Sequence, residues 1–232
     1  MSSIIELHGV SKIYKMGNER VEALKDINLT IEEGDFCCLL GTSGSGKSTL
    51  LNLMAGLEKP TTGEILIKGK HVEKMNEKQL VLFRQKHIGF VFQSYNLLST
   101  LTALENVELP LTFKGIPRAK RLKEATQMLE LVGLKERLKH KPSQMSGGQQ
   151  QRVGIARAFV GKPPIIFADE PTGNLDSRTT IEVMELITSI AKQNNQTLVL
   201  VTHEVEIAQY MNKIIYIRDG TIERIEVKDS KT

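Results

Sequence analysis

Residues 41–48 combine glycines, hydroxyl side chains and one lysine in the spacing G-x-x-x-x-G-K-S, after the apolar run 36–40 and before the helical run 49–57. Glycines allow a loop whose successive N–H groups converge on phosphate oxygens, and the positive end of the following helix dipole strengthens that field. Lys47 adds a point charge for the β- and γ-phosphates, and the Ser48 hydroxyl is placed to ligate Mg²⁺. The segment therefore predicts nucleotide binding through Gly41, Ser43, Gly44, Ser45, Gly46, Lys47, Ser48 and Thr49.

Two carboxylates follow a second apolar run, residues 165–168. Asp169, at the end of that predicted strand, is suited to hold Mg²⁺ through water beside a phosphate loop. Glu170 projects differently from its neighbour and is suited to polarise an attacking water as general base. Taken alone, the pair is equally an acidic strand end in solvent; together with Lys47 and Ser48 it favours a metal–nucleotide site.

A second helix start lies at residues 145–152, Met-Ser-Gly-Gly-Gln-Gln-Gln-Arg. Ser146 and the two glycines begin a helix that continues through residues 155–159, and a helix N-terminus attracts anions. In isolation, the stretch is also explained as a glycine start with a glutamine-rich first turn. It resembles the signature sequence of the ABC ATPases, which usually begins with leucine where this chain has Met145, another long apolar side chain.

Further motifs of the ABC family appear in the family's order. Tyr14 stands where the family has an aromatic residue that stacks on adenine, and Gln93 follows the predicted strand 88–92 as the Q-loop glutamine does. Asp176 ends a Gly-Asn-Leu-Asp stretch that resembles the D-loop, and His203 follows the predicted strand 198–202 like the switch histidine. Each of these residues alone favours an ordinary structural role, but their order and spacing favour the resemblance, which extends from Tyr14 to about residue 220.

The resemblance implies an ATPase that needs two copies of the chain, arranged head to tail around ATP and Mg²⁺. One copy then supplies adenine stacking by Tyr14, metal binding by Ser48, Gln93 and Asp169, and catalytic roles for Lys47, Gln93, Glu170 and His203. The other copy supplies nucleotide contacts from Ser146, Gly147, Gly148, Gln149 and Asp176. Hydrolysis separates the copies, and a membrane partner converts opening and closing into work.

Residues 92–98, 102–107 and 171–176 resemble more narrowly the ATPases of the MacB, LolD and FtsE group, including antimicrobial-peptide exporters of the BceA type. That resemblance implies a separate permease with an extracytoplasmic domain, acting on a macrolide, an antimicrobial peptide or a lipoprotein. An FtsE-like ATPase that regulates cell-wall hydrolysis through its membrane partner is the alternative. Two further classes fit poorly: SMC-type ATPases carry a very long coiled coil between phosphate loop and signature, and ABC-F translation factors carry two ATPase domains.

The elements that must position these residues alternate along the chain. Strand-like runs occur at residues 27–31, 36–40, 64–67, 88–92, 165–168, 198–202 and 214–217, and several are continuously apolar, as in central strands covered on both faces. Residues 94–160 lack convincing strands, and Thr102 with Glu105 predicts a capping box for one of their helices. The pattern predicts a mixed α/β core interrupted by a helical insertion.

The ABC resemblance specifies this fold as a P-loop NTPase, RecA-like core with an antiparallel β subdomain and an inserted α-helical subdomain. It implies a single nucleotide-binding domain over residues 1–232, with a core of about 1–93 and 161–232 and a helical subdomain of about 94–160.

Composition limits the partners. The 31 basic and 27 acidic residues are interleaved, which favours a solvated mixed surface over a nucleic-acid partner. No apolar run approaches the roughly 18 residues that span a bilayer, and residues 1–7 do not resemble a secretory signal. We expect a protein that stays in the cytoplasm, peripheral on the inner face of the cell membrane through its permease. The adjacent Cys37 and Cys38 are expected to be buried and reduced.

Overall fold

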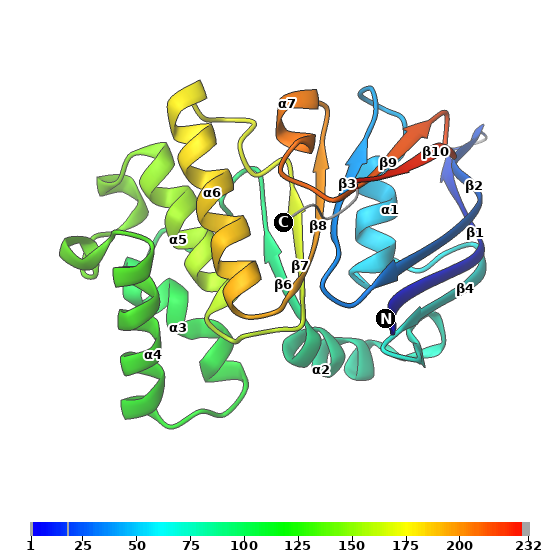
Figure 1. Cartoon of the computed structure of the whole chain (residues 1–232). Helices are drawn as coiled ribbons and strands as arrows, with labels where there is room; N and C mark the ends of the chain where they lie inside the picture. Colours follow the sequence, from blue (N-terminus) through cyan, green and yellow to red (C-terminus); the bar gives the residue numbers. More distant parts are fainter. Residues whose placement is uncertain (1, 18, 229–232) are drawn as a thin grey trace. The chain divides into compact units, whose positions relative to one another are not determined.

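The chain divides into two compact units in the computed structural model, which describes residues 2–17 and 19–228. The first unit comprises Met1–Arg84 with Thr197–Thr232, and the second comprises Gln85–Gln196. Figure 1 labels most elements of both units and colours them along the sequence. Within the described ranges, no helix is both long enough and apolar enough to cross a membrane.

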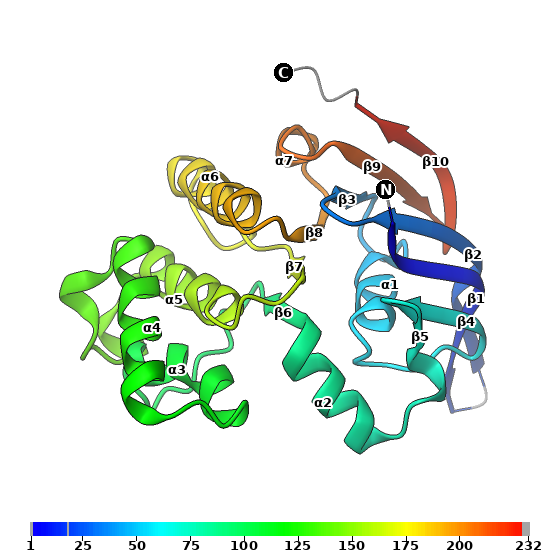
Figure 2. The same cartoon turned by 60° about the horizontal axis from the view of Figure 1, so that its bottom comes forward.

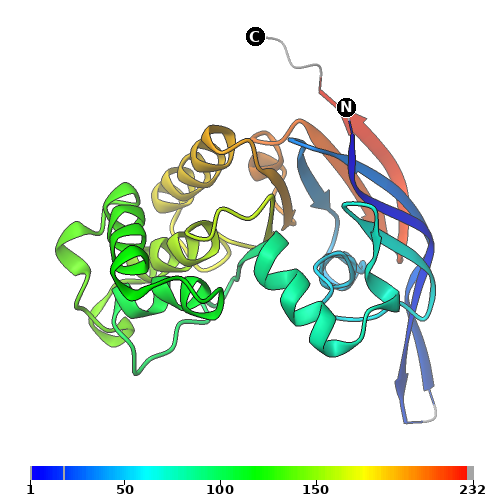
Figure 3. The same ribbon diagram turned by 90° about the horizontal axis from the view of Figure 1, so that it is seen from below.

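An antiparallel sheet in the first unit carries Tyr14. Its strands are β1 (Ser3–Met16), β2 (Glu19–Glu32), β4 (Thr62–Ile67) and β5 (Lys70–His71), in the order β2-β1-β4-β5. The long β1–β2 pairing contains register shifts around Val10 and Lys12. Such irregularities bend a strand and increase its twist, and the sheet is visibly curved in Figure 3. Leu29 and Ile31 of β2 alternate with exposed neighbours and belong to the core.

A second set of strands in the first unit leads to the phosphate loop. β3 (Phe36–Leu40) pairs in parallel with β8 (Thr197–Thr202) and β9 (Lys213–Arg218), and β9 pairs antiparallel with β10 (Thr221–Val227). Every residue of β3 and β8 is buried, as expected for strands covered on both faces. Helix α1 (Lys47–Met54) contacts β8 as well as β2 and β4, so it lies between the two sheets (Figure 3).

Shorter elements complete the first unit and lead out of it. The 3-10 turn η1 (Val72–Lys74) follows β5, and α7 (Val205–Ala208) follows β8. Helix α2 (Glu77–His87) precedes β6 and contains the boundary between the units.

The second unit is a helical assembly on two parallel strands. β6 (Ile88–Val91) pairs with β7 (Ile165–Asp169), and the helices are α3 (Ala103–Phe113), α4 (Arg118–Leu131), α5 (Gly147–Phe159) and α6 (Ser177–Gln193), with 3-10 turns η2 (Lys135–Arg137) and η3 (Pro142–Gln144). Helix α5 contacts α3, α4, α6 and β6, which makes it the centre of this unit (Figure 2). A Cβ on Gly89 of β6 would lie 2.3 Å from the Ala158 carbonyl, so glycine allows α5 to approach the strand.

Most of the expected elements are present. All seven predicted strands form, residues 94–160 contain no strand, and Thr102 and Glu105 make the predicted capping box at α3. The sequence interpretation missed β1, β5 and α2; β1 was missed because its register shifts interrupt a regular alternation. The charged tail over residues 223–232 predicts a last short strand followed by a frayed end; β10 corresponds to that strand, and residues 229–232 lie outside the described residues. The limits of the core, about 1–93 and 161–232, and of the helical subdomain, about 94–160, remain a prediction.

Candidate functional site

The phosphate loop lies between β3 and α1 and is fixed by backbone contacts. Ser45 N–H donates to the Thr42 carbonyl at 3.3 Å, and Gly220 N–H donates to the Ser45 carbonyl at 3.1 Å. A Cβ on Gly41 would lie 2.2 Å from the Ile217 carbonyl, and one on Gly46, at φ 102, would lie 2.6 Å from the Ala23 carbonyl. Glycine is therefore required at both ends of the loop, because other backbone segments approach it closely.

Inside this loop, two polar side chains are buried. Lys47 is 5% exposed, and its ammonium donates to the Thr42 carbonyl at 2.7 Å. Ser45 is 4% exposed, and its hydroxyl finds no hydrogen-bond partner among the described residues. A buried cation and an unsatisfied hydroxyl in a loop without space for a Cβ at Gly41 or Gly46 fit the phosphates of a nucleotide. The predicted nucleotide-binding residues Gly41, Ser43, Gly44, Ser45, Gly46, Lys47, Ser48 and Thr49 lie in or beside this loop of the first unit, and their contacts with a nucleotide remain a prediction.

His203 lies at the same edge of the parallel strands as the phosphate loop. Leu40, the last residue of β3, is opposite Thr202, the last residue of β8. The next residues along the two strands are Gly41 and His203, and carboxyl ends of parallel strands meet at one edge of a sheet. The His203 side chain is exposed there.

Tyr14 is tied to the helix that follows the phosphate loop. Its hydroxyl donates to Glu58 at 2.6 Å, and Glu58 also accepts from Asn52 of α1 at 3.2 Å. The Lys12 ammonium lies 4.9 Å from the centre of the Tyr14 ring. Burial, followed by the hydrogen bond to Glu58, raises the pKa of Tyr14 above its ordinary value. Tyr14 is thus a half-buried ring held beside α1.

Asp169 and Glu170 occupy the end of β7 in the second unit, and both are half-buried. Glu170 has φ 42, a left-handed backbone that costs a non-glycine residue about 1–3 kcal/mol. Its carbonyl accepts from Gly173 N–H at 3.1 Å, which closes the turn into residues 171–176. The turn therefore fixes Glu170 in a direction that an extended strand would not provide.

Gln93 and Glu170 meet at Gly173. A Cβ on Gly173 would lie 2.8 Å from the Gln93 amide nitrogen and 3.5 Å from a Glu170 carboxylate oxygen. The Gln93 carbonyl accepts from the Asn174 side chain at 3.1 Å. Val91 of β6 is opposite Ala168 of β7, so the two strands end together. The structure thus brings Gln93 and the carboxylates to one edge of the second unit.

The signature stretch begins α5 with a capping box. The Ser146 hydroxyl accepts from Gln149 N–H at 3.3 Å, and the Gln149 side-chain oxygen accepts from Ser146 N–H at 3.1 Å. A Cβ on Gly148 would lie 2.9 Å from the Thr179 methyl group of α6. The predicted helix start is therefore present, and its two glycines lie close to neighbouring side chains.

Asp176 caps the N-terminus of α6. Its carboxylate accepts from Thr179 N–H at 3.0 Å and from the Thr179 hydroxyl at 2.7 Å. These bonds, the backbone one first, lower the pKa of Asp176. Since Thr179 also lies against Gly148, this threonine connects the D-loop aspartate with the signature turn. The sequence interpretation missed Thr179, because its type indicates no chemistry.

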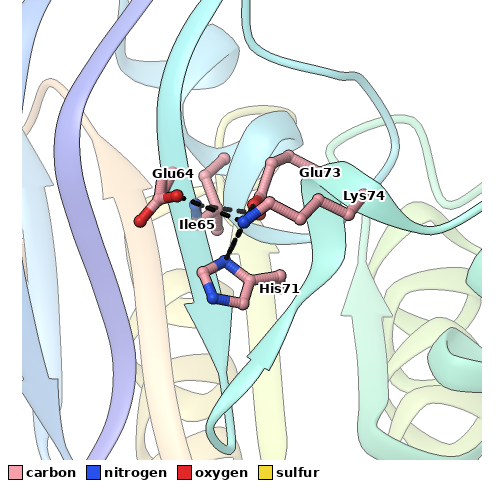
Figure 4. Close-up of polar contacts among 5 residues, drawn as sticks. All are labelled: Glu64, Ile65, His71, Glu73 and Lys74. Carbon is pink, nitrogen blue, oxygen red and sulfur yellow. Dashed lines mark hydrogen bonds and ion pairs between the residues drawn. The ribbon is translucent and has the colours of Figure 1, made fainter.

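A polar cluster that the sequence interpretation did not anticipate lies on β4, β5 and η1 (Figure 4). One oxygen each from Glu64 and Glu73 and a nitrogen of His71 lie within 4.8 Å of one another. The Lys74 ammonium lies among them, 3.2 Å from Glu64 and 3.4 Å from His71 Nδ1, and it lowers the pKa of Glu64. The cluster therefore contains its own cation, and we assign it to local structure.

A P-loop between a parallel strand and a helix, a strand-end carboxylate pair and a Ser-Gly-Gly helix start together define an ATP-binding cassette. The chain belongs to the ABC transporter family, whose model matches residues 24–173. It is the ATP-hydrolysing subunit of an ABC transporter, with the P-loop ABC ATPase fold expected from the sequence, ATP as nucleotide and Mg²⁺ as metal.

Three known proteins illustrate the similarity. The lipoprotein-releasing system ATP-binding protein LolD of Geobacter metallireducens is 46% identical, over 96% of this chain and 99% of its own length. The macrolide export ATP-binding/permease protein MacB of Wolinella succinogenes is 46% identical over 94% of this chain, which spans 34% of that longer protein. The dimeric ATP-binding cassette MJ0796 of Methanocaldococcus jannaschii, solved with ADP and Pi, superimposes with a TM-score of 0.90 at 45% identity, over 98% of this chain and 100% of that one.

Proposed function

We propose that this ATPase drives export or extracytoplasmic work through a separate membrane permease, on a macrolide, an antimicrobial peptide or a lipoprotein. The similarity to LolD over nearly the whole of both chains carries this proposal, because LolD is named as the ATP-binding protein of a lipoprotein-releasing system. The similarity to MacB, which is named for macrolide export, also supports a role in export. We further propose that the permease has an extracytoplasmic domain and holds this chain on the inner face of the membrane.

The working unit in this proposal is a homodimer with ATP between the two copies. MJ0796, a dimeric cassette with ADP and Pi, supports it. Each copy binds adenine through Tyr14 and the phosphates through Gly41–Ser48 and Thr49 of the cradle. The second copy contacts the same nucleotide through Ser146, Gly147, Gly148, Gln149 and Asp176. An isolated copy is therefore an incomplete catalyst.

For the hydrolytic step, we assign Glu170 as the general base that takes a proton from the attacking water, which then bonds to the γ-phosphorus as the bond to ADP breaks. Lys47 and His203 bind the γ-phosphate oxygens. Ser48, Gln93 and Asp169 hold Mg²⁺, which neutralises phosphate charge when bound. The position of Gln93 and Glu170 on either side of Gly173 supports their acting in one step. The products are ADP and inorganic phosphate.

The test is Mg²⁺-dependent ATPase activity against protein concentration, with molar mass from light scattering. We expect specific activity to rise steeply with concentration. Glu170→Gln should lower kcat by about 100-fold or more and form a dimer only with ATP. Glu185→Gln, at an exposed carboxylate of α6 in the same unit, is the matched control and should leave both properties unchanged. A Glu170→Gln chain that hydrolyses ATP normally and stays monomeric would refute the assignments.

The alternative is an FtsE-like ATPase that regulates cell-wall hydrolysis through a membrane partner. Its ATPase chemistry is the same, so the partner distinguishes the two. Co-purification of this chain with a permease that stimulates its ATPase only in the presence of a lipoprotein, peptide or macrolide supports transport. Stimulation by a membrane partner bound to a cell-wall hydrolase supports the alternative.

A further inference from the structure

The segment that follows Gln93 has an unusual backbone. Tyr95 has φ 60 and Asn96 has φ 48, so two consecutive residues that are not glycine adopt the left-handed conformation. Asparagine tolerates this region, but a residue with a bulky ring rarely adopts it. Such a conformation persists only where surrounding groups hold it, and it is concentrated at functional segments.

Arg157 of α5 holds both of these residues by their main chain. Its guanidinium donates to the Tyr95 carbonyl at 2.8 Å and to the Asn96 carbonyl at 2.6 Å. The planar fork of an arginine suits two adjacent acceptors, whereas a lysine ammonium is a point donor. Burial lowers the pKa of Arg157, yet a guanidinium remains protonated in proteins. The left-handed pair is thus fixed to α5 by two charge-assisted hydrogen bonds.

The Tyr95 ring then extends along the same helix to the signature turn. A Cβ on Gly154 would lie 3.6 Å from the Tyr95 carbonyl oxygen, and a Cβ on Gly147 would lie 2.8 Å from the Tyr95 hydroxyl. Gly147 and Gly154 are seven residues apart, which is two turns of helix or about 10 Å. Tyr95 therefore spans the side of α5 between these two glycines, with its main chain at the later turn and its hydroxyl at the first.

The other end of the segment is connected to the catalytic turn. Gln93, two residues before Tyr95, accepts a hydrogen bond from Asn174 and lies beside Gly173 and Glu170. Residues 93–96 are thus held between the turn after β7 and the length of α5. All of these contacts lie within the second unit.

We propose that Tyr95 is a positioning residue for the signature turn: with its main chain fixed by Arg157, the size of its side chain sets how closely Gly147 can approach this segment. The inference rests on the proposed function, in which Gln93 acts on one nucleotide and the signature turn contacts the nucleotide of the other copy. A displacement of Gln93 in one site is then transmitted through Tyr95 to the turn that serves the other site. The two nucleotide sites of the dimer are coupled through this side chain.

A double-mutant cycle between Tyr95 and Gly147 tests this contact in the Glu170→Gln chain, with the ATP-dependent dimer dissociation constant measured by light scattering. The Cβ of Gly147→Ala meets the Tyr95 hydroxyl at 2.8 Å, but the next ring atom is 3.7 Å away. We expect Gly147→Ala to weaken dimerisation by about tenfold or more, and Tyr95→Phe to restore it to within about threefold by removing the clash. If Gly147→Ala weakens dimerisation equally in the chain with Tyr95 and in the Tyr95→Phe chain, the proposal is overturned.

Arg157→Lys tests the other end of Tyr95, its main chain. This variant keeps Glu170, and its ATP affinity and its turnover are measured separately. We expect ATP affinity of the monomer within about twofold of the native value, with kcat lowered by about threefold to tenfold. Arg118→Lys, at the exposed start of α4, is the matched control. Equal kcat for Arg157→Lys and native protein would overturn the role of Arg157.

If Arg157→Lys does not fold, as judged by thermal unfolding, the Tyr95–Gly147 cycle still decides the proposal. The double-mutant cycle also distinguishes a failure of this inference from a failure of the proposed function. A Glu170→Gln chain that forms no dimer with ATP refutes the proposed function and this inference with it. A dimer without coupling between Tyr95 and Gly147 refutes this inference alone.

Discussion

Two helices of this protein, α1 and α5, begin in glycine-containing sequences that suit an anion, but their first turns are built in opposite ways. Gly46 precedes α1 with φ 102, and in the described part of the chain no side chain caps that helix. Ser146 precedes α5 in an extended conformation, and a reciprocal capping box with Gln149 satisfies its first turn. The atom nearest to the start of α1 is a backbone carbonyl, that of Ala23, whereas the start of α5 lies against the Tyr95 hydroxyl and the Thr179 methyl.

In the proposed function, the two helix starts are two different kinds of anion site. The first turn of α1 has fixed surroundings and a buried lysine, so it is prepared to hold phosphate without rearrangement. The first turn of α5 is satisfied by its own side chains and bordered by side-chain rather than backbone atoms, which can shift when the nucleotide of the proposed second copy is bound. Five substitutions test this contrast.

Lys47→Ala should have the largest effect. Removing the buried ammonium from the α1 cradle should weaken ATP binding by about 100-fold or more, because charge-assisted contacts to phosphate are among the strongest. Nucleotide titration by calorimetry measures the ATP affinity, with Lys78→Ala on the exposed side of α2 as control. Affinity within threefold of the native value would show that the cradle does not depend on this charge.

Gly46→Ala and Gly148→Ala compare the surroundings of the two helix starts directly. At Gly46 the new Cβ meets a backbone carbonyl at 2.6 Å with φ positive, so the free energy of unfolding should fall by about 2–3 kcal/mol. At Gly148 it meets a side-chain methyl at 2.9 Å, and alanine favours helix, so the loss should stay below about 1 kcal/mol. Denaturant unfolding measures both. Equal losses would remove the distinction between rigid and adaptable surroundings.

Ser146→Ala should affect stability and catalysis together. Loss of the cap should lower the free energy of unfolding by about 1 kcal/mol. If the same hydroxyl also contacts the nucleotide of the second copy, ATPase activity should fall by about tenfold while ATP affinity of the monomer is retained. Unfolding and steady-state assays on one preparation measure the pair. Unchanged activity would restrict Ser146 to a structural role.

Thr102→Ala should have the smallest effect, because it removes the same kind of capping box from α3, in which we place no nucleotide contact. The free energy of unfolding should fall by about 1 kcal/mol. The ATPase activity of the folded protein should remain native. A loss of activity as large as that of Ser146→Ala would mean that capping alone, rather than nucleotide contact, explains the signature serine.

The parts of this molecule that were predictable from sequence are those decided by local patterns. The phosphate loop follows from strand–loop–helix spacing over a few residues, and the Thr102–Glu105 box follows from a three-residue separation. The contact of Arg157 with Tyr95 joins positions 62 apart and depends on a left-handed tyrosine that residue type disfavours. The lysine among Glu64, His71 and Glu73 likewise depends on the folding of a short hairpin. Such features follow from tertiary packing, which single-sequence patterns do not encode.

The two buried cysteines of β3 have a practical consequence for studying motion in this protein. Cys37 and Cys38 are both fully buried with free thiols. Burial raises the pKa of Cys38 to about 12 and raises the pKa of Cys37 as well, so thiolate is scarce at neutral pH. Maleimide reagents and oxidants should therefore leave the folded chain untouched. A cysteine introduced at an exposed position would become the reactive label site without removal of the native pair, and slow labelling of Cys37 and Cys38 would report opening of the β3 core.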